Sequence, residues 1–129
     1  MRVVTLCSGL DAPIVALKQL GVPFEYVMAC ESDRHLRAVI QANHPPATMY
    51  DDVFSITARD LKHIGEIDLV VAGPPCQPYS SLGRQRGLGD ERSDALVGCI
   101  RCIGWLQPKC FVIENVTGLK HHDKGQTWR

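Results

Sequence analysis

The feature that most constrains the fold is an alternation of short β-branched apolar runs with segments of helical periodicity. The apolar runs predict five strands, at residues 3–7, 24–30, around 49–50, 67–72 and 110–114. Apolar residues at three- and four-residue spacing predict helices at residues 13–20, 33–43, 57–64 and 93–106. Such alternation is typical of a mostly parallel sheet with helices on both faces, so the sequence predicts a doubly wound α/β fold.

Size and composition indicate one small folded domain. The chain has 129 residues, 45% of them hydrophobic, with 14 basic and 14 acidic side chains. An ordinary apolar share without net charge argues against disorder. No apolar run approaches the about 20 residues that cross a membrane, and no basic-then-apolar leader opens the chain. We therefore expect an intracellular protein, nuclear if eukaryotic and otherwise cytoplasmic, with its six cysteines reduced.

The zero net charge conceals an uneven distribution. Residues 1–70 carry six basic and nine acidic side chains, and residues 71–129 carry eight basic and five acidic ones. An enzyme acting on nucleic acid needs positive charge for the phosphates, and the net charge alone supplies none. On charge patterning alone, scattered surface charges account for the late basic excess better than a nucleic-acid-binding face does.

Two candidate ligand-binding residues follow the first two predicted strands. In α/β sheets ligands bind beyond the carboxyl ends of the strands, where Gly9 allows close backbone approach. Glu31 lies 22 positions after Gly9, and an acidic residue about 20 positions beyond a glycine turn binds ribose hydroxyls in such folds. With one glycine in the motif, a plain tight turn and a surface glutamate remain an alternative.

A candidate nucleophile and a candidate acid follow the later strands. Cys76 stands among three prolines that restrict the backbone, as expected for a thiol held in place for reaction. Glu114 closes the last apolar strand, where a carboxyl group is costly to bury unless it is used or paired. Adjacent strand ends would bring the two together for covalent and acid chemistry. The alternatives are a structural cysteine and a salt-bridged strand terminus.

The residues Pro-Pro-Cys-Gln-Pro-Tyr-Ser at 74–80, followed by Glu-Asn-Val at 114–116, resemble the motifs of the DNA cytosine-5 methyltransferases. The resemblance runs from Val3 to about Thr127 and implies a Rossmann-like methyltransferase fold, S-adenosylmethionine as cofactor and DNA as substrate. It implies cofactor contacts at Cys7, Ser8, Gly9 and Leu10 for the methionine part, Glu31 for the ribose, Asp52 and Val53 for the adenine, and Pro75 beside the methyl group.

The same resemblance implies that Cys76 attacks the cytosine ring and that Glu114 engages the pyrimidine edge. It also implies that residues 80–92 form a loop closing over a flipped-out base. The nucleic-acid contacts it implies are Gln77, Ser80, Arg84 and Arg92. No metal is implied.

The chain departs from the family pattern in its first motif. Cys7 and Asp11 stand where Phe-x-Gly-x-Gly has its aromatic residue and second glycine, and Ser32 stands where a large apolar residue often meets the adenine. After Asn115 the strand–helix pattern gives way to a polar tail. The family's later arginine-bearing strand, target-recognition region and final helix have no counterpart. We therefore expect residues 1–129 to be the N-terminal part of the catalytic domain, with a second polypeptide segment as a possible partner.

Three functions remain open from the sequence. The first is DNA cytosine-5 methylation. The second is methylation of transfer RNA, on which one branch of this family acts. The third is an inactive or split-enzyme fragment that needs a partner segment. Cys99 and Cys102 form a C-x-x-C, but they share a helix face with apolar residues, which favours packing over zinc binding.

Overall fold

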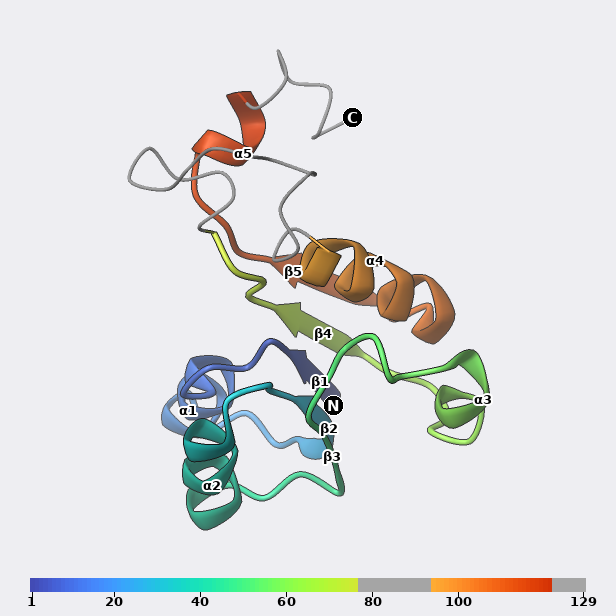
Figure 1. Ribbon diagram of the computed structural model, residues 1–129. Helices are drawn as coiled ribbons and strands as arrows, with labels where there is room; N and C mark the ends of the chain where they lie inside the picture. Colours follow the sequence, from blue (N-terminus) through green and yellow to red (C-terminus); the bar gives the residue numbers. More distant parts are fainter. Residues whose placement is uncertain (77–93, 122–129) are drawn as a thin grey trace.

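The computed structural model describes residues 1–76 and 94–121, which form a single parallel sheet with helices on both sides (Figure 1). The elements in chain order are β1 Arg2–Leu6, α1 Ala12–Gln19, β2 Glu25–Cys30, α2 Arg34–Asn43, β3 Thr48–Tyr50, α3 Ala58–Leu61, β4 Leu69–Ala72, α4 Asp94–Leu106, β5 Cys110–Ile113 and α5 Gly118–His121. Within the described residues, no helix is long and apolar enough to cross a membrane.

The sheet has five strands in the order β3-β2-β1-β4-β5, and every pair is parallel. The chain therefore builds outward from β1 through β2 to β3, then returns to the other side of β1. The strand order reverses between β1 and β4, which is where such sheets open a crevice for ligands. The predicted doubly wound α/β fold is confirmed, and the five predicted strands are all present.

Two apolar clusters, one on each face of the sheet, hold the helices in place. On one face Ile14 of α1 and Ile40 of α2 pack on Val3 and Ala29. On the other face α3 and α4 cover residues that include Leu6, Met28 and Val70. Figure 1 shows α1 and α2 to the left of the sheet and α3 and α4 to the right. Alternate residues of β1 thus serve opposite faces, as expected for a fully covered parallel strand.

Short polar side chains define where the helices begin. The Asp33 carboxylate accepts hydrogen bonds from the backbone N–H groups of His35 at 2.7 Å and Leu36 at 3.3 Å, which caps α2. Thr57 and Asp60 cap α3 through reciprocal side-chain and backbone hydrogen bonds. These caps fix where α2 begins after β2 and where α3 begins before β4.

The prediction of a polar tail after Asn115 is wrong for residues 118–121. These residues form α5, and Leu119 is 2% exposed, packed with Leu96, Ile113 and Val116. One apolar side chain in a polar stretch gives no periodic signal. The helix is stabilised by packing against Leu96 of α4 and Ile113 of β5, and the local sequence does not show these contacts.

Candidate active site

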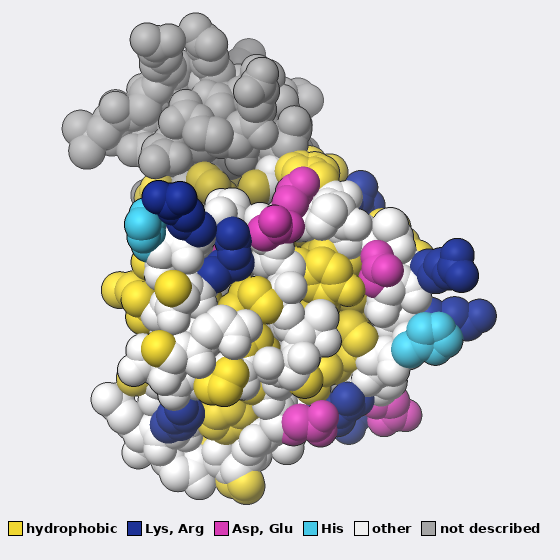
Figure 2. All heavy atoms as spheres, turned by 60° about the horizontal axis from the view of Figure 1, so that its bottom comes forward, with side chains coloured by type: hydrophobic (Ala, Val, Ile, Leu, Met, Phe, Trp, Pro, Cys, Tyr) yellow, Lys and Arg dark blue, Asp and Glu magenta, His cyan; other side chains and the backbone are white. Residues whose placement is uncertain are grey.

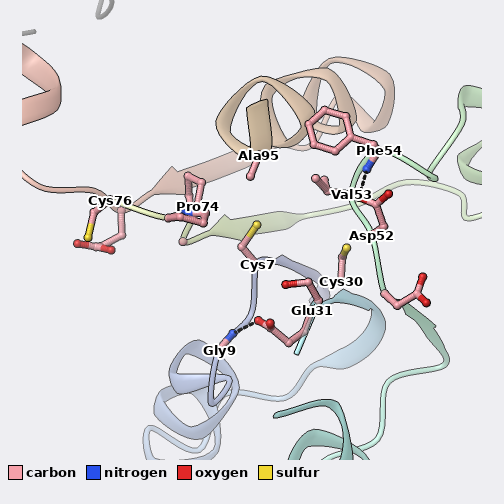
Figure 3. Close-up of a pocket in the computed structure, with 15 residues that line it drawn as sticks. Cys7, Gly9, Cys30, Glu31, Asp52, Val53, Phe54, Pro74, Cys76 and Ala95 are labelled. Atoms are coloured by element: carbon pink, nitrogen blue, oxygen red, sulfur yellow. Dashed lines mark hydrogen bonds between the residues drawn. The ribbon is translucent and has the colours of Figure 1, made fainter. Parts of the chain in front are cut away.

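A cavity of about 450 Å³ opens at the carboxyl ends of the strands, where the sequence predicts ligand binding (Figure 3). Its walls come from the ends of β1, β2, β3, β4 and β5 and from the first turn of α4. In Figure 3, Cys76 lies at one end of this cavity, and Glu31 and Asp52 lie toward the other. The cavity therefore joins the two candidate sites that the sequence identifies.

The turn after β1 is held by Glu31 at the end of β2. The backbone N–H of Gly9 donates to Glu31 Oε2 at 2.7 Å, and the backbone N–H of Asp33 donates to Oε1 at 2.9 Å. Glu31 is 7% exposed and lines the cavity. A carboxylate oxygen has two lone pairs and can accept a second hydrogen bond, so both oxygens of Glu31 retain capacity for ligand hydroxyls. Gly9 has a φ of +55°, and a Cβ there would stand in open space.

Asp11, a departure from the family pattern, belongs to a buried polar network behind this turn. Its carboxylate accepts a hydrogen bond from the Tyr26 hydroxyl, which lies 2.6 Å from Thr5 Oγ1. Thr5 Oγ1 is in turn 2.7 Å from Ser8 Oγ. Burial raises the pKa of Asp11, against the lowering effect of its hydrogen bonds. The network ties the turn between β1 and α1 to Tyr26 of β2.

The turn after β3 is held by α4. Asp52 Oδ1 accepts a hydrogen bond from the Phe54 backbone N–H at 2.8 Å. The Arg101 guanidinium donates to the Phe54 carbonyl at 3.2 Å and the Val53 carbonyl at 3.4 Å. It also lies 5.6 Å from the centre of the Phe54 ring and 5.0 Å from that of Trp105. Val53 and Phe54, which line the cavity, are therefore positioned by a helix distant in sequence.

Replacing Gly98 with alanine is expected to destabilise the protein, although alanine favours a helix. A Cβ at Gly98 would lie 2.7 Å from Val53 Cγ1 and 3.4 Å from Cγ2, and valine has little rotamer freedom to move away. Overpacking of this kind costs about 1–3 kcal/mol. At Gly104, in the same helix, a Cβ would meet nothing within 4 Å, so Gly104→Ala should gain up to about 1 kcal/mol. Urea unfolding of both variants measures the two effects. Equal free energies of unfolding would show that a Cβ at Gly98 is not hindered by Val53.

The proline-rich turn after β4 meets the end of β5. The Glu114 backbone N–H donates to the Ala72 carbonyl at 2.9 Å, and the Asn115 side-chain amide donates to the Pro74 carbonyl at 3.1 Å. Cys76 is half-buried and Glu114 is exposed, and both line the cavity. Adjacent strand ends thus present a thiol and a carboxyl group to one space.

Most of the predicted site residues that the structure describes share this cavity. They are Cys7, Gly9, Glu31, Asp52, Val53, Pro75, Cys76 and Glu114. Ser8 and Leu10 line instead a smaller cavity of about 260 Å³, which also borders Cys7 and Glu114. The predicted nucleic-acid contacts Gln77, Ser80, Arg84 and Arg92 lie outside the described residues.

Sequence reasoning missed several residues of the site. Cys30 and Phe54 line the cavity, while Arg101 and Asn115 hold its walls in place. Cys30 and Phe54 adjoin predicted residues at the same strand ends, and Asn115 stands within the Glu-Asn-Val motif, so a wider window would have included them. For Arg101 the sequence carries no comparable signal, because its partners lie 47 and 48 positions away.

Comparison with known proteins matches the whole chain to the family that its sequence motifs resemble. The family model described as C-5 cytosine-specific DNA methylase matches residues 1–129. The chain is 38% identical over 129 residues to the orphan methyltransferase M.SPRI of Bacillus phage SPR, covering 98% of this chain and 29% of that protein. It is 31% identical over 131 residues to the type II methyltransferase M.AquIA of a Picosynechococcus strain, covering 97% of this chain and 52% of that protein.

Among solved structures, the Dnmt2 methyltransferase of S. pombe superposes with a TM-score of 0.76 at 25% sequence identity. The match covers 100% of this chain and 40% of that protein. The chain thus spans about a quarter to a half of the length of the curated relatives described above. Because the family model covers every residue, the chain belongs to the C-5 cytosine-specific DNA methylase family.

Proposed function

We propose that this protein transfers a methyl group from S-adenosylmethionine to carbon 5 of cytosine in DNA. The observation that carries the proposal is the shared cavity, in which Gly9 and Glu31 lie near one end and Cys76 and Glu114 line the wall. A nucleoside-binding carboxylate and a candidate nucleophile at one space are what a two-substrate transfer requires.

The residues present fit S-adenosylmethionine. The Glu31 carboxylate faces the cavity with acceptor capacity for two ribose hydroxyls, and Gly9 leaves room for a ligand against the backbone. Val53, Phe54 and Pro74 supply apolar surface suited to an adenine ring. When bound, the cofactor supplies an electrophilic methyl group. In this proposal Cys7, Ser8, Gly9 and Leu10 approach the methionine part, Asp52 and Val53 hold the adenine, and Pro75 lies beside the methyl group.

The proposed role of Cys76 follows from the chemistry of cytosine. Carbon 5 of the ring is too weakly nucleophilic to accept a methyl group directly. Bond formation between the Cys76 thiolate and carbon 6 makes carbon 5 enamine-like, while the Glu114 carboxyl group donates a proton to ring nitrogen 3. After methyl transfer, a water molecule takes the proton from carbon 5, the carbon–sulfur bond breaks, and the thiolate leaves, while ring nitrogen 3 returns its proton to Glu114. The Asn115 to Pro74 hydrogen bond keeps the two strand ends together during these steps.

The substrate is proposed to be DNA with its target cytosine flipped out, because the reacting carbons are inaccessible within a stacked duplex. On the face drawn in Figure 2, Lys and Arg side chains occur in separate places among apolar and acidic ones. On the family resemblance, we assign phosphate and base contacts to the segment that carries Gln77, Ser80, Arg84 and Arg92, and to segments beyond residues 1–129.

We also propose that residues 1–129 are the N-terminal part of the catalytic domain and that a further segment covers β5. Phe111 and Val112 of β5 are 55% and 49% exposed, which is unusual for apolar residues of a strand in a parallel sheet. The two curated relatives described above are much longer, because the match covers 29% of one and 52% of the other. A target-recognition region would belong to that remaining length.

Product analysis tests the proposed reaction. The full-length protein is incubated with methyl-tritiated S-adenosylmethionine and either duplex DNA or transfer RNA, and the nucleosides are separated after digestion. We expect label in 5-methyl-2′-deoxycytidine from DNA. Label confined to 5-methylcytidine from transfer RNA would establish the RNA alternative instead. Label in neither product would contradict the assignment of a methyltransferase activity.

A further inference from the structure

Two cysteines that form no bond to substrate in the proposed reaction lie in contact at the wall of the cavity. Cys7 Sγ is 3.7 Å from Cys99 Sγ, although the residues are 92 positions apart in the sequence. Cys7 follows β1 and lines the cavity, and Cys99 is fully buried in α4. Figure 3 shows the Cys7 sulfur directed toward the space beneath α4. The pair therefore joins a site wall accessible to small molecules to a buried residue of α4.

We propose that Cys7 and Cys99 form a redox-active dithiol, a modification site at which hydrogen peroxide or another small peroxide closes a disulfide across the cofactor cavity. The site is distinct from Cys76, which is the nucleophile of the proposed reaction. Its effect on cofactor binding, but not the formation of the bond, rests on the proposed function.

The geometry favours this pair over other pairings within the local cluster. Cys30 and Cys102 also belong to the apolar cluster beneath α4, but the sulfur contact within it is between Cys7 and Cys99. Cys7 has a φ of 51°, a left-handed conformation that few non-glycine residues adopt. The backbone around it thus holds its side chain toward α4. Bond formation shortens the sulfur–sulfur distance from 3.7 Å to about 2.05 Å.

The electrostatics of the pair make Cys7 the attacking thiol. The hydrogen bond from Cys99 lowers the pKa of Cys7, against the opposing effects of burial and of Glu31. The same contact and burial raise the pKa of Cys99. Burial also raises the pKa of Cys30, and it raises the pKa of Cys102 to about 11. Because the thiolate is the reactive form, oxidation begins at Cys7, which the cavity exposes to peroxide.

The reaction balances with one peroxide per pair. The Cys7 sulfur attacks a peroxide oxygen, the oxygen–oxygen bond breaks, and the departing hydroxide takes the Cys7 proton to form water, leaving a sulfenic acid. The Cys99 sulfur then attacks the Cys7 sulfur, the sulfur–oxygen bond breaks, and hydroxide leaves with the Cys99 proton as a second water. Two thiols lose two electrons in total, and the peroxide is reduced to water. An added dithiol reductant reverses the bond by exchange.

The bond would alter the cofactor cavity directly. Cys7 lies two residues before Gly9, whose N–H binds Glu31, and Cys99 adjoins Gly98, which packs on Val53. Drawing the sulfur atoms together therefore displaces the turn after β1 relative to α4. We expect oxidation to weaken binding of S-adenosylhomocysteine on the order of tenfold or more, with recovery after reduction.

Peptide mapping tests the bond without reference to the cofactor. Trypsin separates all six cysteines into different peptides, with Cys7 in residues 3–18, Cys99 in residues 93–101 and Cys102 in residues 102–109. The full-length protein is treated with hydrogen peroxide at one equivalent per chain, free thiols are alkylated, and the digest is analysed without reduction. We expect peptides 3–18 and 93–101 linked, with the loss of two hydrogen atoms.

The control variants separate this pair from its neighbours. Cys99→Ser should leave Cys7 as a sulfenic acid, trapped by dimedone, whereas Cys102→Ser should form the link as the wild-type protein does. Linkage of Cys7 to another cysteine, or an unlinked Cys7 in wild-type protein after peroxide is consumed, would overturn the proposal. If the reduced protein does not bind S-adenosylhomocysteine, the proposed function fails while the mapped link still decides the dithiol.

Discussion

Replacing Cys76 with serine is expected to abolish methyl transfer to cytosine while leaving cofactor binding intact. A serine hydroxyl is almost entirely protonated near neutral pH, so the ring loses its activating nucleophile. Loss of covalent activation should lower the rate by at least about 10³-fold, or about 4 kcal/mol in barrier. The measurement is the rate of tritium transfer to DNA by the full-length protein, beside calorimetry with S-adenosylhomocysteine.

A matched control is Cys110→Ser, because Cys110 is exposed in β5 and does not line the cavity. This variant should retain wild-type transfer. Full activity in the Cys76→Ser protein would exclude Cys76 as the nucleophile. Loss of S-adenosylhomocysteine binding in the same protein would show that the substitution disturbs the fold rather than the chemistry.

Among single substitutions at the proposed cofactor contacts, Glu31→Ala is expected to produce the largest loss of cofactor affinity. The substitution removes the proposed partner of the ribose hydroxyls and leaves the Gly9 and Asp33 N–H groups without their acceptor. A hydrogen bond to a charged group contributes about 1.5–3 kcal/mol, so the dissociation constant should rise roughly 10- to 150-fold for each one lost. Calorimetry with S-adenosylhomocysteine measures the change.

Two control variants show whether that loss is specific to the Glu31 carboxylate. Glu31→Gln keeps one oxygen acceptor and should show a smaller loss. Glu25→Ala removes a carboxylate at the opposite end of β2, which is exposed and paired with Arg2, and this variant should bind as the wild-type protein does. Unchanged affinity in Glu31→Ala would refute the ribose assignment, and an equal loss in Glu25→Ala would point to general damage to β2.

The sheet could be predicted from the sequence because each strand is a local apolar run and the connections carry glycine, proline or polar residues typical of turns and helix ends. The position of the cavity followed as well, since parallel strands bring their carboxyl ends to one edge. Gly9, Glu31, Cys76 and Glu114 each follow a strand, and all four line the cavity. Local pattern and topology therefore placed the principal candidate residues.

The supporting contacts could not be predicted, because they join segments with no local signal. The hydrogen bond from Arg101 to the Phe54 carbonyl spans 47 positions, and the Cys7–Cys99 contact spans 92. The C-x-x-C was correctly interpreted as packing, since Cys99 and Cys102 are both fully buried. The partner of Cys99 across the sheet edge, however, depends on how α4 lies over β1, which periodicity does not encode.

Cys76 is expected to form the covalent bond to cytosine beside the cofactor, and trapping the covalent complex measures this bond itself. Duplex DNA containing 5-fluorocytosine is incubated with the full-length protein and S-adenosylmethionine. Fluorine at carbon 5 cannot leave as a proton does, so the adduct persists. After digestion by trypsin and nuclease, we expect the nucleotide on the peptide of residues 63–84, which carries Cys76 and no other cysteine. A nucleotide on a peptide carrying a different cysteine, or no adduct with DNA that the protein otherwise methylates, would contradict the claim.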